Sequence, residues 1–173
     1  MALFHKEFNS LQELLVDQVR DLYDAEQRLL KALPKMAEAA SSPELRACFS
    51  NHLQETKMHA DRLEQVVQQL GEDAEAETCE AMKGLISEGE EMVKAKGDPD
   101  VRDAALIAAA QRVEHYEMAG YGAARSFAQR LGLTTVAEIL QTTLEEEGNA
   151  DKKLTQIALG SVNPQASRAS TTM

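Results

Sequence analysis

The stretch HLQETKMHADRL, residues 52–63, places ionisable side chains on the apolar face of what its spacing predicts to be a helix. Glu55 and His59 are four residues apart, about one helical turn, so both side chains leave the same face. Phe49 and Leu63 are predicted to share that face. Burying a carboxylate or an imidazole without a partner is costly. The stretch therefore predicts a core helix whose Glu55 and His59 side chains have a partner inside the protein.

The composition is typical of a single globular domain with a helical core. The chain has 173 residues, of which 43% are hydrophobic and only 4% aromatic. A net charge of −11 argues against nucleic acid and anionic membranes as partners, because phosphate binding uses clusters of Lys and Arg. We find no signal-peptide segment and no apolar run of about 18 residues. Cys48 and Cys79 form no CxxC pair, so we expect reduced thiols and a cytoplasmic protein.

Start and stop signals predict four long helices and one short helix. The first begins at a capping box, residues 10–13, and extends to about residue 40, with Pro34 expected to kink or break it. The other predicted helices span residues 42–71, 78–97, 98–132 and 134–160. Thr78 is expected to cap the short helix. No segment has the alternating pattern of a strand.

The connection between the second and third long helices decides the predicted topology. It spans roughly 26 residues, including the short helix, and is long enough to cross the length of a bundle. We therefore predict an all-α, ferritin-like four-helix bundle with one long crossover that contains an extra short helix. The bundle is assigned to residues 1–160, and the polar segment 161–173 is predicted to be a disordered tail.

Each long helix interrupts its apolar stripe with acidic residues near the middle. The candidate metal ligands are Glu26, Glu55, His59, Glu114, Glu117, Glu147 and Asp151. Converging carboxylates repel one another, and desolvation adds to the cost. The nearby basic residues are expected to point outward or sideways, so a pair of metal ions would resolve the conflict. An oxygen-rich set with one imidazole favours iron or manganese over zinc.

The spacing departs from the usual di-iron and di-manganese pattern. Those bundles use a Glu from each of two helices and a Glu-x-x-His pair from each of the other two. Here the matching pairs are Glu55 with His59 and Glu147 with Asp151, both spaced by four. The residues alone leave open whether Glu114 or Glu117 is the main ligand of its helix, and whether His52 is a hydrogen-bonding partner or a partly exposed side chain.

Three segments resemble a known family: HLQET with the RLEQV that follows it, VRDAALIAAAQRVEHYEMAGYG at 101–122 and TLEEEGNADKKLTQIA at 143–158. Over roughly residues 8–160 the chain resembles the YciE/YciF family of ferritin-like, rubrerythrin-like bacterial stress proteins. The resemblance implies a homodimer and a dinuclear metal centre. By position it implies ligands at Glu26, Glu55, Glu114 or Glu117, Glu147 and Asp151. We expect Gln at position 59 in this family, so His59 would be an added ligand or an outer group.

The expected function is a stress-response protein that binds two iron ions per chain and reacts with oxygen or hydrogen peroxide. The alternatives are a manganese catalase-like enzyme and a non-catalytic dimeric stress or assembly protein with a structural or vestigial metal site. A nucleophilic hydrolase, a phosphate-loop enzyme and a zinc protease find no support, because their sequence motifs are not present.

Overall fold

The computed structural model describes residues 6–72 and 77–169, and this part of the chain contains helices and no strand. The helices are α1 (Leu11–Ala39), α2 (Pro43–Gln69), α3 (Glu80–Lys94), α4 (Pro99–Arg130), α5 (Thr134–Ile157), the π-helix η1 (Ala158–Val162) and α6 (Asn163–Ala169). The prediction of an all-α protein is confirmed.

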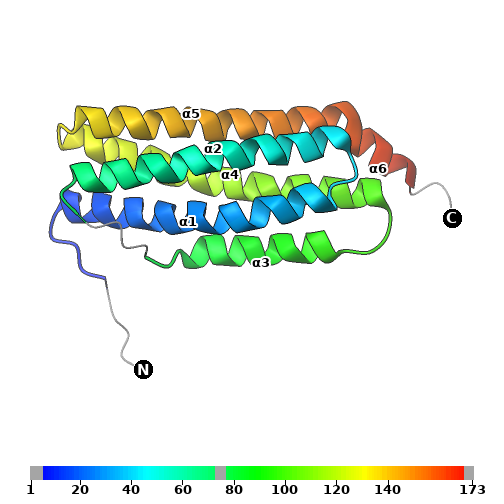
Figure 1. The fold of residues 1–173 in the computed structure, drawn as a ribbon, viewed down its shortest axis with the longest axis horizontal. Coiled ribbons are helices and arrows are strands. Elements are labelled where there is room, and N and C mark those ends of the chain that lie inside the picture. Colours follow the sequence, from blue (N-terminus) through cyan, green and yellow to red (C-terminus); the bar gives the residue numbers. More distant parts are fainter. Residues whose placement is uncertain (1–5, 73–76, 170–173) are drawn as a thin grey trace, which may run out of the picture.

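The four long helices form a bundle of two hairpins (Figure 1). α1 packs against α2 and α4 against α5, while α2 also contacts α5 and α1 also contacts α4. α3 runs back along α1 and α4, so that α4 begins at the end of the bundle where α2 begins. The predicted bundle with a long crossover and an extra short helix is therefore confirmed.

Local sequence signals and one buried contact fix the helix starts. The Ser10 hydroxyl accepts a hydrogen bond from the Glu13 N–H at 3.1 Å, and the Glu13 carboxylate accepts one from the Asn9 N–H at 2.8 Å. The N–H of Ser42, before α2, donates to the buried Asp103 of α4 at 2.6 Å. This contact ties the start of α2 to α4, on the other hairpin.

Two local predictions are corrected in detail. α1 continues through the exposed Pro34, so the alternative of a helix break there is wrong, while the alternative of a kink stays a prediction. The N-cap of α3 is Cys79 rather than Thr78, and the Cys79 sulfur accepts a hydrogen bond from the Met82 N–H at 3.3 Å.

The segment after residue 160 is ordered as helix through Ala169, where we had predicted a disordered tail. The reason is packing: Ala158 and Val162 are buried and join the apolar cluster at that end of the bundle. The last part of the predicted tail, residues 170–173, lies outside the described residues.

The apolar core consists of two clusters with a polar layer between them. One cluster contains Leu29, Leu33, Phe49, Leu106, Ile107 and Leu154, and the other contains Leu15, Leu22, Leu63, Val66, Tyr121 and Leu140. In α1, for example, the buried Glu26 separates Leu22 of one cluster from Leu29 of the other. The core is thus divided across its middle by ionisable side chains.

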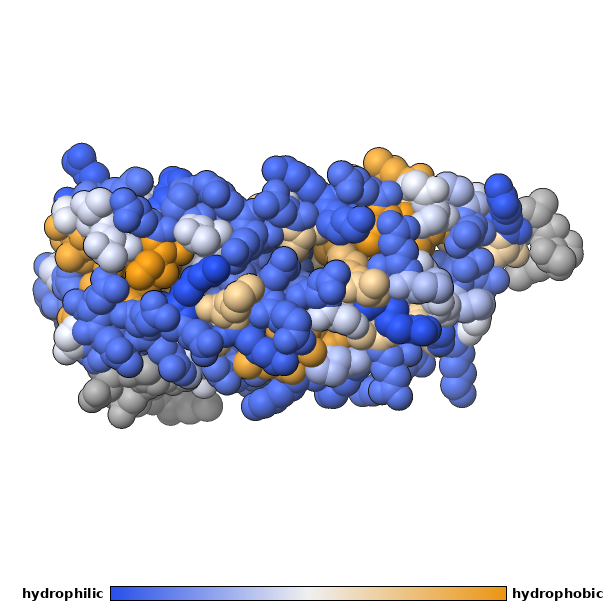
Figure 2. Space-filling model, turned by 45° about the horizontal axis from the view of Figure 1, so that its top comes forward, coloured by the Kyte–Doolittle hydropathy of each residue, from blue (hydrophilic) through white to orange (hydrophobic). Residues whose placement is uncertain are grey.

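The outer surface is mostly hydrophilic on the face seen in Figure 2, where apolar side chains form separate patches. None of the helices in the described part of the chain combines the length and the apolar composition of a membrane span.

Candidate metal centre

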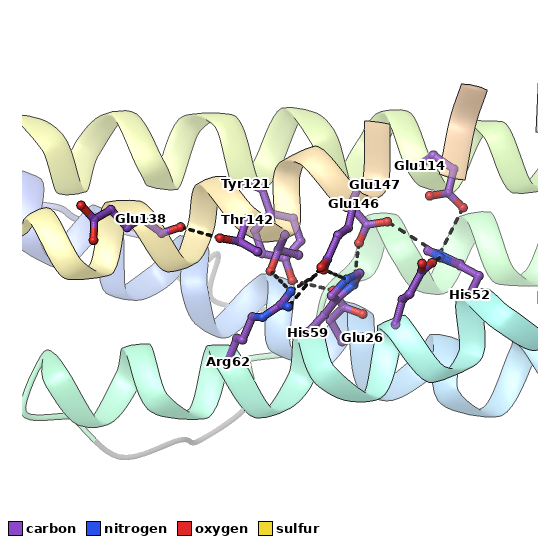
Figure 3. Close-up of polar contacts among 12 residues, drawn as sticks. Glu26, His52, His59, Arg62, Glu114, Tyr121, Glu138, Thr142, Glu146 and Glu147 are labelled. Atoms are coloured by element: carbon purple, nitrogen blue, oxygen red, sulfur yellow. Dashed lines mark hydrogen bonds and ion pairs between the residues drawn. The ribbon is translucent and has the colours of Figure 1, made fainter. Parts of the chain in front are cut away.

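Six ionisable side chains from all four long helices meet in the polar layer. They are Glu26 of α1, His52 and His59 of α2, Glu114 and Glu117 of α4, and Glu147 of α5, and none is more than 5% exposed. Figure 3 shows five of them, all but Glu117, pointing toward the interior of the bundle. The rows of apolar residues on either side hold the four helices in register around this layer.

The six side chains form two overlapping groups of possible metal ligands. One group is His52, Glu114, Glu117 and Glu147, and the other is Glu26, His59 and Glu147; within each, the ligand atoms lie within 4.8 Å of one another. Glu147 belongs to both groups through different oxygens. Its Oε2 is 3.7 Å from Nε2 of His52, and its Oε1 is 2.9 Å from Nδ1 of His59. Glu147 therefore stands where a bridging carboxylate would be needed.

The atoms that face one another in this layer lack hydrogen-bond partners within the described structure. They are both carboxylate oxygens of Glu117 and of Glu147, Oε2 of Glu26 and of Glu114, Nε2 of His52 and Nδ1 of His59. The contact between His59 and Glu147 is short but is not aligned as a hydrogen bond. Buried polar atoms are normally hydrogen-bonded. A layer with this many unpartnered oxygen and nitrogen atoms is therefore suited to bind cations.

His59 is oriented by a carboxylate on its outer side. Nε2 of His59 lies 2.9 Å from Oε2 of Glu146. Arg62 binds both oxygens of Glu146, with Nη2 at 3.1 Å from Oε1 and Nη1 hydrogen-bonded to Oε2. An acceptor at Nε2 keeps one proton there, so that in the neutral ring the lone pair of Nδ1 is directed into the bundle.

His52 has a similar arrangement with the opposite ring nitrogen. Its Nδ1 is 3.2 Å from Oε2 of Glu55, and its Nε2 points inward, 3.4 Å from Oε1 of Glu114. The Glu55 side chain is 42% exposed, whereas the Glu146 side chain is 28% exposed and held by arginine. The two imidazoles are thus oriented by outer carboxylates that differ in how firmly they are fixed.

Burial disfavours charge on most carboxylates of the layer. It raises the pKa of Glu26, and it raises the pKa values of Glu114 and Glu117 well above the ordinary range. Burial also acts to raise the pKa of Glu147, but its contacts with His59 and His52 outweigh that effect, so its pKa is lowered overall. Glu147 therefore keeps its negative charge most readily.

The carboxylates make both imidazoles more basic. Burial alone would lower the pKa of His52, but Glu114 and Glu55 raise it to about 9. Burial likewise opposes charge on His59, but Glu147 and Glu26 raise its pKa to about 10. Without a cation both rings therefore carry a second proton at neutral pH, and a metal ion must displace that proton from each ring.

Five of the seven predicted ligands lie in this layer: Glu26, His59, Glu114, Glu117 and Glu147. Glu114 and Glu117 are three residues apart on one face of α4, and both lie in the group of possible ligands, so the structure supports both as candidates.

The structure does not bring Glu55 into the group. Thr56 fills the inward position and is fully buried, and Glu55 leaves the helix one residue, about 100°, earlier. The inward face of α2 follows the alternating spacing 49, 52, 56, 59 and 63, which includes His52. That spacing is visible in the sequence and would have identified His52 as a candidate ligand in place of Glu55.

Asp151 is also placed outside the group. Its side chain is 19% exposed, accepts a hydrogen bond from the Gln111 amide at 2.9 Å and lies 3.4 Å from Nε2 of His115. Both partners belong to α4, so Asp151 joins α5 to α4 beside the layer.

Comparison with known proteins places this arrangement in a family. Residues 10–167 match the profile of a "Domain of unknown function (DUF892)". Protein YciF of Escherichia coli K12 is 42% identical over 158 residues, which cover 91% of this chain and 95% of YciF.

Solved structures agree with the sequence comparison. The crystal structure of the Escherichia coli stress protein YciF superposes with a TM-score of 0.87 at 41% identity, over 90% of this chain and 99% of that chain. YcfI from Rhodopseudomonas palustris superposes with a TM-score of 0.85 at 40% identity, over the same shares of the two chains. The resemblance to the YciE/YciF family is confirmed, and the chain belongs to the DUF892 family.

Proposed function

We propose that the polar layer binds two metal ions per chain, iron in the first place, with Glu147 shared between them. The observation that carries this proposal is the set of buried, unpartnered oxygen and nitrogen atoms that converge from four helices. Without a cation the layer holds four buried carboxylates against two imidazoles, an arrangement that desolvation makes costly. Two divalent ions would neutralise it.

The donor set supports this reading. Four carboxylates and two imidazoles are the same inventory that di-iron and di-manganese bundles supply from their four helices. Their distribution differs, because both histidines come from α2 and α5 contributes only Glu147. Hard carboxylate oxygens with a minority of imidazole nitrogen suit iron and manganese.

The protein's own groups would position and shield the ions. The Tyr121 hydroxyl donates to Oε1 of Glu26 at 2.5 Å, which fixes that carboxylate and leaves Oε2 free to face the layer. Arg62 and Glu146 hold the ring of His59, and the two apolar clusters exclude water from both sides. Bound iron would supply redox chemistry toward oxygen or peroxide, which side chains of this layer do not provide.

The test is iron titration of the metal-free protein under air, followed by absorbance in the near ultraviolet. We expect oxidation faster than the rate without protein, and a return to that background in Glu147→Gln. Glu145→Gln, an exposed neighbour on the same helix, serves as the control. Oxidation by the wild-type protein at the protein-free rate would reject this activity.

A second assay separates iron from manganese. The donor set suits both metals, so peroxide consumption is compared after loading with each. Faster peroxide disproportionation with manganese would favour a catalase-like enzyme. Binding of two ions without reaction toward oxygen or peroxide would favour the non-catalytic stress or assembly role.

A further inference from the structure

A groove between α2 and α5 reaches one of the six candidate ligands. It has a volume of about 400 Å³, and its lining includes Glu44, Asn51, His52 and Glu55 of α2 and Ala150 and Lys153 of α5. Of these residues only His52 belongs to the polar layer. We refer to this depression as the access groove.

The ring of His52 separates the access groove from the interior. Nδ1 lies 3.2 Å from Glu55, which also lines the groove, whereas Nε2 faces Glu114 and Glu147 at 3.4 and 3.7 Å. His52 therefore has one side on the groove and the other on the candidate metal centre.

We propose that a hydrated divalent cation reaches the interior through the access groove, with the Glu55–His52 pair as its gate. This inference rests on the proposed metal centre and adds the route by which that centre is filled. Glu44 and Glu55 offer carboxylates and Asn51 an amide oxygen, which are ligands that hard cations accept while they shed water. Burial raises the pKa of the Cys48 thiol in this groove to about 11, so the free thiol is protonated at neutral pH.

Besides the ring of His52, Lys153 is the other positive charge in the groove lining that opposes a cation. Its Nζ is 3.7 Å from Oε1 of Glu44, across the rim, and both side chains are more than half exposed. Such a pair is weak, so the lysine charge acts mainly through the field at the groove mouth. Removing it should draw cations in faster without changing the final amount bound.

The first experiment measures the rate of Co²⁺ loading into the metal-free full chain by stopped-flow absorbance. Lys153→Gln should load roughly threefold faster than wild type at low salt, and the difference should vanish near 1 M salt. Lys152→Gln makes the same charge change on the neighbouring exposed residue, outside the groove lining, and should have a smaller effect. Equal acceleration by the two variants, or none, would overturn the proposal.

A steric variant tests the same route independently. Ala150→Trp should obstruct the groove and slow loading about tenfold or more, while equilibrium binding stays at the wild-type amount. Ala119→Trp, at an exposed site on α4, is the matched control and should load normally. Normal loading of Ala150→Trp would contradict the route. If that variant fails to fold or binds less metal, the lysine pair decides.

These outcomes are distinct from failure of the metal centre itself. Wild-type protein that binds no Co²⁺ at equilibrium would reject the proposed function. Wild-type protein that binds two ions, with loading insensitive to the groove variants, would reject only the access route.

Discussion

The two histidine ends of the polar layer differ in how they are closed. At the His59 end, Glu146 is held by Arg62, and Tyr121 fixes Glu26 beneath the apolar cluster. At the His52 end, the outer carboxylate is the 42% exposed Glu55 and the ring borders a groove. Both ends thus have a carboxylate on the outer nitrogen of an imidazole. At the His59 end arginine holds that carboxylate, and at the His52 end it is exposed beside the groove.

The largest effect should come from the residue that joins the two ends. Glu147→Gln removes the charge shared by both ligand groups, and we expect the affinity for two ions to fall by about 100-fold or more. The stabilisation that metal gives, about 2.7 kcal/mol at 100 times the wild-type dissociation constant, should fall to about 0.4 kcal/mol or less at the same metal concentration. Thermal unfolding with and without Mn²⁺ measures this, and Glu145→Gln is the control. A metal-dependent rise in Tm that survives in Glu147→Gln would contradict the shared role.

The His59 and His52 ends should differ in how much metal affinity is lost when the outer carboxylate of each, Glu146 or Glu55, is replaced by an amide. Glu146→Gln should weaken metal binding about 10- to 100-fold, because His59 loses its charged acceptor and Arg62 loses its carboxylate partner. Glu55→Gln should cost less, because the exposed Glu55 is solvated and less firmly fixed. Chelator competition on both variants gives the two affinities. A larger loss in Glu55→Gln would reverse the comparison.

Acidity should act on both ends together. The pKa values of His52 and His59 in the folded protein, about 9 and about 10, lie above the ordinary 6.5. The stability from their protons is complete below pH 6.5 and is lost as the pH rises toward 9 and 10. Metal needs the neutral rings, so Mn²⁺ affinity should rise about tenfold between pH 7.0 and 7.5, with release of about two protons on binding. Calorimetry in buffers of different ionisation heats measures the protons, and affinity that does not change with pH would count against imidazole ligation.

The smallest effect should come from a hydroxyl at the closed end. Tyr121→Phe leaves Oε1 of the buried Glu26 unpartnered and should lower the free energy of unfolding of the metal-free protein by about 1–3 kcal/mol. Tyr23→Phe removes a comparable hydrogen bond, 2.6 Å from Glu64, at a partly exposed site and should cost less than about 1 kcal/mol. Urea unfolding of both variants makes the comparison. Equal losses would mean that Tyr121 gains nothing from its burial beside Glu26.

The sequence predicted the bundle well because its signals are local and repeated. Caps, prolines and glycines mark the helix ends, and the connection between α2 and α4 is long enough to allow the crossover. The helix at residues 161–169 was missed because it depends on packing. Val162 is apolar but isolated in a polar segment, and its burial and the contacts of α6 with α4 are not visible in the sequence.

The site was predicted less completely, for two reasons. One is the direction in which Glu55 leaves α2, and the other is the contact between Glu146 and a residue on another helix. Glu26, Glu114, Glu117 and Glu147 interrupt clear apolar stripes, so spacing alone identifies them. Glu55 was preferred to His52 because the usual Glu-x-x-His pattern was sought in α2. With His59 as the histidine of that pattern, its glutamate would stand at position 56, where the structure has the buried Thr56. The outer role of Glu146 depends on Arg62, 84 residues away, and no local pattern in α5 reveals that contact.

Anomalous diffraction from crystals of the protein, purified without added metal, tests the central claim most directly. We predict two peaks at the iron or manganese edge, about 3.5–4 Å apart, on either side of the Glu147 carboxylate. One should lie beside His52 and Glu114, and the other beside His59 and Glu26. No anomalous density in this layer, or a single ion bound outside it at Glu55 or Asp151, would contradict the account.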